Sequence, residues 1–200
     1  MLSQDERPVP GLRERKKAKT RAAIQQHALR LFREQGYEAT TVEQIAEAAE
    51  VSPSTYFRYF PTKEDVVLWD DLDPLLIAAF EAQPSELSPI LALRGALRLV
   101  FAGLPAEEME QQWERSRLIL SVPELRMRML DQFAGIIEVI AELVANRLGR
   151  RAEDFAVRTF AGAVTGALLA TLFASADGPG PDFLIQMDDC LALVEAGMPL

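Results

Sequence analysis

The sequence predicts an all-α protein of about nine helices. Through most of the chain, apolar residues recur three and four positions apart, which is the period of an amphipathic helix. No segment of the sequence sustains the two-residue alternation of a half-buried strand. Proline and glycine divide the chain into pieces of about ten to twenty-five residues, a usual length for globular helices. The dividing positions are Pro74, Pro84, Pro89, Gly103–Pro105, Pro123, Gly149 and Asp177–Pro181.

The first helix is expected over residues 13–35, and Gly36 ends it because glycine takes the left-handed conformation readily. The second helix begins after Thr41, whose side chain caps it while Gln44 reaches back. Such a capping box contributes about 1 kcal/mol. The apolar faces of these two helices are Ile24, Ala28, Leu31 and Phe32, then Val42, Ile45, Ala46 and Ala49.

The third helix follows a tight turn at Glu50 and Val51. Ser52 is its expected N-cap, and Pro53 is its first helical residue, where a missing N–H costs nothing. The helix must end before Pro61, because the residue ahead of a proline resists the helical conformation. It therefore has barely two turns.

A fourth helix begins after Thr62, with Glu64 and Asp65 favourably placed in its first turn. Three short helices precede it, and the last two are joined by a turn of a few residues. This arrangement is a helix-turn-helix, a motif whose last helix can lie in the major groove of DNA.

The third helix carries four aromatic residues within five positions, although the 200-residue chain has only 15. Tyr56 and Phe60 are four apart and are expected to face inward, whereas Phe57 and Tyr59 point elsewhere. Four rings could also simply fill a small core.

Charge is distributed unevenly along the chain. The net charge of −9 alone argues against a nucleic-acid partner. However, residues 1–63 hold eleven Lys/Arg against eight Asp/Glu, whereas residues 64–200 hold ten against twenty-two. We therefore expect a small N-terminal part that tolerates a polyanion and a larger acidic part that does not.

The segment "AIQQHALRLFREQGYEATTVEQIAEAAEVSPSTYFRYFPTKEDVV" closely resembles the DNA-binding region of the tetracycline-repressor (TetR) family of bacterial regulators, over roughly residues 18–67. The resemblance implies a disordered tail at 1–12, a DNA-binding domain at 13–62 and a ligand-binding and dimerisation domain at 63–200. It also implies a cytoplasmic regulator, a repressor by expectation, that binds a palindromic double-stranded DNA operator as a homodimer and responds to a small hydrophobic effector.

The resemblance also assigns DNA-contacting positions. Arg58 is the candidate for reading guanine, Phe57 for packing on a thymine methyl, and Thr41, Tyr59 and Lys63 for binding phosphates. Many members have Lys-Gly or a similar pair where this chain has Pro53-Ser54, so the base read there is not implied. The groove-facing set is Ser52, Pro53, Ser54, Thr55, Phe57 and Arg58.

Six basic residues lead into this domain, in "RERKKAKTR". Such an arm can follow the phosphates or enter the minor groove, and each neutralised phosphate adds about −0.9 to the salt slope. The alternative is a solvated terminus without function. The six residues are Arg13, Arg15, Lys16, Lys17, Lys19 and Arg21.

Residues 159–176 carry no charge over eighteen positions, which is the lower limit for a membrane span. They are rich in Ala, Gly and Thr, so we expect burial on all sides and no membrane. In the family this segment and the last helix of each subunit pair into a four-helix dimer interface. The interface residues expected here are Gly162, Gly166, Leu169, Phe173, Phe183, Leu184, Met187, Leu191 and Val194.

The resemblance further implies an enclosed effector pocket, with Arg117 as the anion partner, although ordinary core is the alternative for each residue. "FRYFPTKEDVV" followed by "WDDLDP" is similar to the subgroup that binds fatty acyl or acyl-coenzyme-A-like ligands. The expected lining is Leu97, Phe101, Trp113, Arg117, Leu120, Met127, Leu130, Phe133 and Ile137.

Two other classes of function stay open. An enzyme is disfavoured because His27 stands alone among polar residues and the lone Cys190 lies in an apolar stripe. The sequence has no Gly-rich phosphate loop, nucleophile elbow or metal-spaced cluster, so we expect no catalytic residue, cofactor or metal. The second alternative is an accessory helical dimer that does not bind DNA. A single cysteine and the polar N-terminal segment favour a reducing, cytoplasmic setting.

Overall fold

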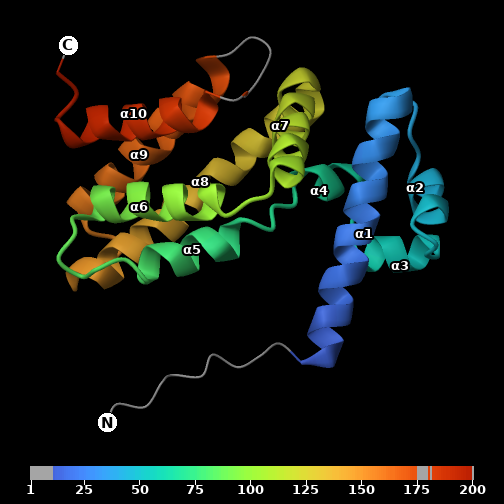
Figure 1. Ribbon diagram of the computed structural model, residues 1–200, viewed down its shortest axis with the longest axis horizontal. Coiled ribbons are helices and arrows are strands. Elements are labelled where there is room, and N and C mark those ends of the chain that lie inside the picture. The colour runs from blue at the N-terminus through green and yellow to red at the C-terminus, as the bar shows by residue number, and fades with distance from the viewer. Residues whose placement is uncertain (1–10, 175–179, 181, 200) are drawn as a thin grey trace. The chain divides into compact units, whose positions relative to one another are not determined.

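The computed structural model describes residues 11–174, 180 and 182–199, and over these residues the protein forms ten α-helices and no strand (Figure 1). The all-α prediction is confirmed. The tail predicted at residues 1–12 lies outside the described residues except for Gly11 and Leu12, and most of the Asp177–Pro181 break does too. The chain divides between Trp69 and Asp70 into an N-terminal unit and a C-terminal unit.

The N-terminal unit contains four helices around one small core. Ile24 and Ala28 of the first helix, Ile45 of the second and Tyr56 of the third are all fully buried. The inward direction predicted for Tyr56 and Phe60 is confirmed, since both rings are buried whereas Phe57 is 48% exposed. The helices are α1 (Leu12–Gln35), α2 (Val42–Ala48), α3 (Pro53–Tyr59) and α4 (Lys63–Leu68).

Side-chain caps begin the three short helices where the sequence places them. In the capping box of α2, Thr41 Oγ1 accepts from Gln44 N at 3.2 Å and Gln44 Oε1 accepts from Thr41 N at 2.9 Å. Ser52 Oγ accepts from Thr55 N at 3.1 Å to begin α3. A further capping box begins α4 at Thr62. These caps fix the residues at which α2, α3 and α4 begin.

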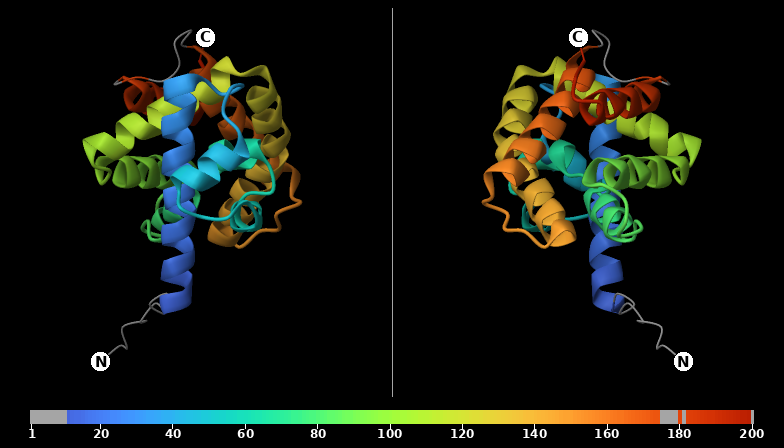
Figure 2. Two further views of the ribbon diagram at one scale, coloured as in Figure 1. Left: turned by 90° about the vertical axis from the view of Figure 1, so that its right-hand side faces the viewer. Right: turned by 90° about the vertical axis from the view of Figure 1, so that its left-hand side faces the viewer.

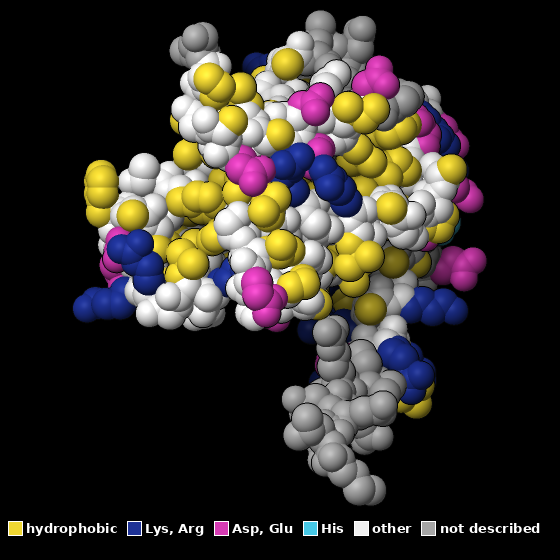
Figure 3. All heavy atoms as spheres, turned by 60° about the vertical axis from the view of Figure 1, so that its left-hand side comes forward, with side chains coloured by type: hydrophobic (Ala, Val, Ile, Leu, Met, Phe, Trp, Pro, Cys, Tyr) yellow, Lys and Arg dark blue, Asp and Glu magenta, His cyan; other side chains and the backbone are white. Residues whose placement is uncertain are grey.

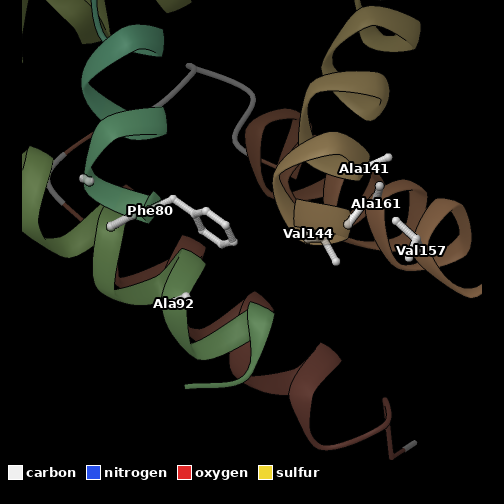
Figure 4. Close-up of a cluster of buried hydrophobic side chains, with 9 residues drawn as sticks. Phe80, Ala92, Ala141, Val144, Val157 and Ala161 are labelled. Carbon is white, nitrogen blue, oxygen red and sulfur yellow. The ribbon is translucent and has the colours of Figure 1, made fainter. Parts of the chain in front are cut away.

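The C-terminal unit contains six helices. α5 and α6 pack together on one side of its main core, and α8 and α9 face them from the other side (Figure 4). Phe80 of α5 is the one large side chain among nine buried residues there, and the other eight are all alanine or valine. These small residues let the helices approach closely. The helices are α5 (Asp73–Glu81), α6 (Pro89–Ala102), α7 (Ala106–Ser121), α8 (Pro123–Leu148), α9 (Phe155–Ala174) and α10 (Phe183–Glu195).

Helix α10 packs on α9 and α6 (Figure 2). A second cluster joins these helices and is formed by Ile90, Val164 and Leu191. Leu191 was predicted at a dimer interface, and this prediction is wrong, because its side chain is fully buried inside the single chain. Leu191 packs on Ile90 of α6 and Val164 of α9, and so it does not face a partner subunit.

Helix α9 is long and apolar enough, by length and composition, to cross a membrane. In the structure Val157, Ala161 and Val164 of this helix are buried against its neighbours in the C-terminal unit. Its burial is one-sided, however, since Phe155, Gly166 and other residues of the opposite face are exposed. Within one protomer the helix therefore keeps an apolar face free, and burial on all sides, which was expected together with a partner helix, stays a prediction.

Candidate nucleic-acid interface and effector cavity

The outer surface of α3 is exposed and mixes polar, apolar and basic groups. Thr55 and Tyr59 are half-buried at its edges. The opposite side of the helix is anchored in the core by the rings of Tyr56 and Phe60. Their centroids lie 6.0 Å apart. The structure thus brings the predicted groove-facing set onto one side of a rigidly held helix. Its exposed members are Ser52, Pro53, Ser54, Phe57 and Arg58.

Tyr56 secures the C-terminal end of α3. Its hydroxyl donates to the carbonyl oxygen of Thr62 at 3.3 Å, across the turn into α4. Burial, followed by the nearby carboxylates of Asp65 and Glu64, raises the pKa of this phenol. Tyr56 therefore stays neutral and keeps donating throughout the physiological range.

Thr41 lies exposed at the start of α2, but both of its expected phosphate-binding groups already take part in the capping box. Its backbone N–H donates to Gln44, and its hydroxyl oxygen accepts from Gln44 N. The hydroxyl proton is not used by either bond. A phosphate contact at Thr41 would thus use the hydroxyl as donor.

Lys63 joins the start of α4 to the turn between α1 and α2. Its ammonium donates to the carbonyl oxygens of Tyr37 at 3.0 Å and Thr40 at 3.3 Å, and lies 4.1 Å from the centroid of the Tyr37 ring. Tyr37 in turn donates from its hydroxyl to Glu64 at 2.9 Å. An ammonium has three N–H groups, and two of those of Lys63 are used in holding the fold, so its phosphate contact stays a prediction.

Arg21 differs from the other five residues of the basic segment. Its guanidinium lies 4.0 Å from the Trp69 ring centroid and 5.8 Å from those of Tyr59 and Phe60. Its buried Nε has no hydrogen-bond partner. The prediction that Arg21 reaches DNA is therefore not supported by its position, because its guanidinium packs among rings of its own unit. The other five, Arg13, Arg15, Lys16, Lys17 and Lys19, are exposed on the first turns of α1.

A cavity of about 360 Å³ lies between α6 and α10 in the C-terminal unit. It brings together two residues predicted for the effector pocket, Leu97 and Phe101, with two predicted for the dimer interface, Leu184 and Met187. The rest of the lining is Arg98, Ala102, Ile185 and Asp188. The other residues predicted for the pocket do not line this cavity; they are Trp113, Arg117, Leu120, Met127, Leu130, Phe133 and Ile137.

An ionic cluster links the same two helices. Arg94 of α6 donates from Nε and Nη2 to the two oxygens of Asp188 at 3.0 Å each, and from Nη1 to Glu195 at 2.7 Å. Arg98 donates from Nη2 to Asp188 at 2.5 Å. Hydrogen bonds from Arg94 and then Arg98 hold the pKa of Asp188 well below its usual range, so this carboxylate stays ionised.

Arg115 of α7 is a buried charge that sequence reasoning missed. It donates to Asp70 Oδ2 at 2.5 Å and to Gln112 Oε1 at 2.8 Å. Burial raises the pKa of the nearby Asp73 carboxyl, and the negative charge of Asp70 raises it further. The sequence carried no signal for this pair because its members lie 45 residues apart. Arg117, which was the predicted anion partner, instead pairs with Glu110 at 2.7 Å.

The outer faces of α9 and α10 expose apolar residues. Phe155 is 85% exposed, and an added Cβ at Gly162 or Gly166 would meet nothing within 4 Å. Phe173, Ile185 and Leu193 are exposed as well. Figure 3 shows a face of the molecule on which hydrophobic side chains surround a small group of acidic and basic ones. Clustered apolar surface of this kind is typical of a contact between proteins.

Comparison with known proteins identifies both parts of the chain. Residues 24–68 match the family described as bacterial regulatory proteins, tetR family, and residues 87–199 match the MftR C-terminal domain. The regulator TcmR of Streptomyces glaucescens is 39% identical over 152 residues, which are 72% of this chain and 67% of that protein. MftR of Mycobacterium tuberculosis is 33% identical over 159 residues, which are 78% of this chain and 79% of that protein.

Two solved structures share the fold. The FadR repressor of Thermus thermophilus, solved with lauroyl-CoA, has a TM-score of 0.57 and 24% identity over 90% of this chain and 95% of its own. The SmeT–triclosan complex has a TM-score of 0.58 and 19% identity over 90% and 91% of the two chains.

Proposed function

The chain belongs to the TetR family of bacterial transcriptional regulators, and we propose that it is a repressor that binds a palindromic operator as a homodimer and leaves it when a small hydrophobic effector binds. The family's members are DNA-binding regulators with an N-terminal helix-turn-helix and a C-terminal effector domain. The operator, the symmetry and the effector class are the parts proposed for this chain.

The exposed surface of α3 is the observation that carries this proposal. Arg58 and Phe57 project from a helix whose opposite side is anchored by Tyr56 and Phe60. A guanidinium that is exposed on such a helix can donate two hydrogen bonds to the O6 and N7 atoms of guanine. The basic first turns of α1 supply phosphate contacts that strengthen binding without reading sequence.

A dimer supplies a second copy of α3 to contact the bases. One two-turn helix contacts few bases, whereas two-fold pairing engages two half-sites about 34–36 Å apart or a multiple of that distance. The exposed faces of α9 and α10 support an interface there, and the open surfaces of Gly162 and Gly166 would admit a close partner helix. Leu169 and Phe173 continue this stripe on α9.

The effector is proposed to be hydrophobic because the α6–α10 cavity is lined largely by Leu, Ile, Phe and Met side chains. Two structural relatives were solved with lauroyl-CoA, which carries a long apolar acyl chain, and with triclosan, which is largely apolar. A fatty acyl effector, or the acyl chain of an acyl-coenzyme-A-like effector, fits this character.

Selection of bound sequences from random duplex DNA tests the proposal. We expect recovery of a palindrome with half-sites spaced by whole helical turns, and binding that weakens steeply as salt rises. Recovery of no enriched sequence at low salt, or the same affinity after Arg58→Ala and Lys63→Ala together, would favour the accessory-dimer alternative.

A further inference from the structure

The cavity between α6 and α10 has the size of one small molecule. Its volume of about 360 Å³ corresponds to about twelve water-sized groups at roughly 30 Å³ each. Six of its eight lining residues are apolar, and they come from the end of α6 and the start of α10. An unbranched or aromatic body of about a dozen non-hydrogen atoms would therefore fill it.

The two charged lining residues are not equally available to a ligand. Asp188 already accepts hydrogen bonds on both oxygens, from Arg94 and from Arg98. Arg98 donates one hydrogen bond, to Asp188, and its side chain is 62% exposed. Since a guanidinium has five N–H donors, Arg98 can take a second acceptor, whereas a cation would have to displace two arginines from Asp188.

We propose that this cavity is an effector site for an amphipathic monoanion: an apolar body of about ten carbons lies between α6 and α10, and its carboxylate pairs with Arg98 at the rim. The site shares only Leu97 and Phe101 with the pocket that the sequence predicted, and its arginine is Arg98 and not Arg117.

Occupancy of the site would act on α10. A ligand carboxylate would share the Arg98 guanidinium with Asp188, while both hydrogen bonds from Arg94 to Asp188 remain. The ion pair between Arg98 and Asp188 would thus be weakened, and the apolar body of the ligand would push α6 and α10 apart. This consequence rests on the proposed function, since α10 is part of the proposed dimer interface, and the binding itself does not.

Calorimetric titration of the full chain without DNA tests the site. The probes are decanoate, decanol and decylamine, which share a ten-carbon body and differ in the charge of the head group. We expect saturable one-to-one binding of decanoate, binding of decanol at least tenfold weaker, and no measurable binding of decylamine.

Three variants locate the binding. Arg98→Leu is expected to weaken decanoate binding at least tenfold and leave decanol binding within twofold of the parent. Ala102→Phe, at the exposed end of α6, is expected to fill the cavity and abolish binding of both molecules. Arg150→Leu is the matched control, because Arg150 also forms an exposed pair with an aspartate, Asp154, at 2.7 Å, away from the cavity. It should leave the affinity for decanoate unchanged.

Several results would overturn the site. These are decanoate binding that survives Ala102→Phe in a variant with a normal circular dichroism spectrum, equal affinities for decanoate and decylamine, or a loss caused by Arg117→Leu but not by Arg98→Leu. Decanoate binding that behaves as expected but releases no selected operator DNA would keep the site and refute its role as the effector site. Absence of DNA binding altogether would refute the proposed function and leave the titration unaffected.

Discussion

Replacing Arg94 with methionine tests whether the ionic cluster holds α10 in place. The Arg94 side chain is 16% exposed and makes three hydrogen bonds to carboxylates at 2.7–3.0 Å. A hydrogen bond to a charged group contributes about 1.5–3 kcal/mol, and breaking a buried ion pair costs about 3–5 kcal/mol. Asp188 and Glu195 remain 23% and 34% exposed, and Arg98 stays on Asp188, so the expected loss is lower, at about 2–3 kcal/mol.

Urea unfolding of the full chain measures this loss. With an m value of about 2 kcal/mol/M, the midpoint should fall by about 1–1.5 M and the m value should stay the same. Arg150→Met removes an exposed pair four residues apart and should cost at most about 0.5 kcal/mol. If Arg94→Met costs no more than Arg150→Met, the cluster does not stabilise α10 and the reasoning is refuted.

The same variant has a pH signature. The pKa of Asp188 is depressed in the folded protein, so its contribution to stability is complete above the unfolded pKa and is lost as the pH falls. The stability difference between the parent and Arg94→Met should be constant above about pH 5 and shrink below about pH 4. A difference that grows on acidification would contradict this sign.

Three further predictions concern the N-terminal unit. Arg58→Ala should weaken binding to the selected operator by about 1–3 kcal/mol and relax the preference at one base pair of each half-site, measured by fluorescence anisotropy on single-base variants. Glu50 has a φ of +54°, so Glu50→Gly should raise the free energy of unfolding by about 0.5–1 kcal/mol, which urea titration detects; a loss would show that its side chain stabilises the turn. Lys16→Ala with Lys17→Ala should lower the magnitude of the salt slope of DNA binding by about 1.8 for each arm in contact with phosphates, and an unchanged slope would leave both residues in solvent.

Local signals predicted the N-terminal unit well. Thr41, Ser52 and Thr62 cap their helices as expected, because a cap is a contact between residues two or three positions apart and is fully written in the local sequence. The same holds for Gly36, which ends α1 with a φ of +89°. The direction of Tyr56 and Phe60 followed from helical spacing alone.

In the C-terminal unit, local sequence signals did not predict which surfaces and side chains meet. An apolar stripe on a helix has the same appearance whether it faces the core or a partner, and so Leu191 was assigned to the wrong side. Arg94 and Asp188 lie 94 residues apart, and nothing in the sequence distinguishes them from charged residues that stay exposed. The cavity mixes residues of α6 and α10 that were predicted for two different surfaces, because its walls depend on how these helices pack.

The boundary between the two units is another feature that local sequence did not predict, because it depends on long-range contacts. The sequence placed it at Thr62, where a cap begins a helix, yet the contacts of α4 lie with the N-terminal unit. Gln25 Nε2 of α1 donates to the carbonyl oxygens of Val66 at 3.0 Å and Trp69 at 2.8 Å, and Arg21 packs on the Trp69 ring. A helix start is a local property, whereas a unit ends where long-range contacts end. Those contacts satisfy the last carbonyls of α4 from a helix about forty residues earlier, so no window of local sequence could show them.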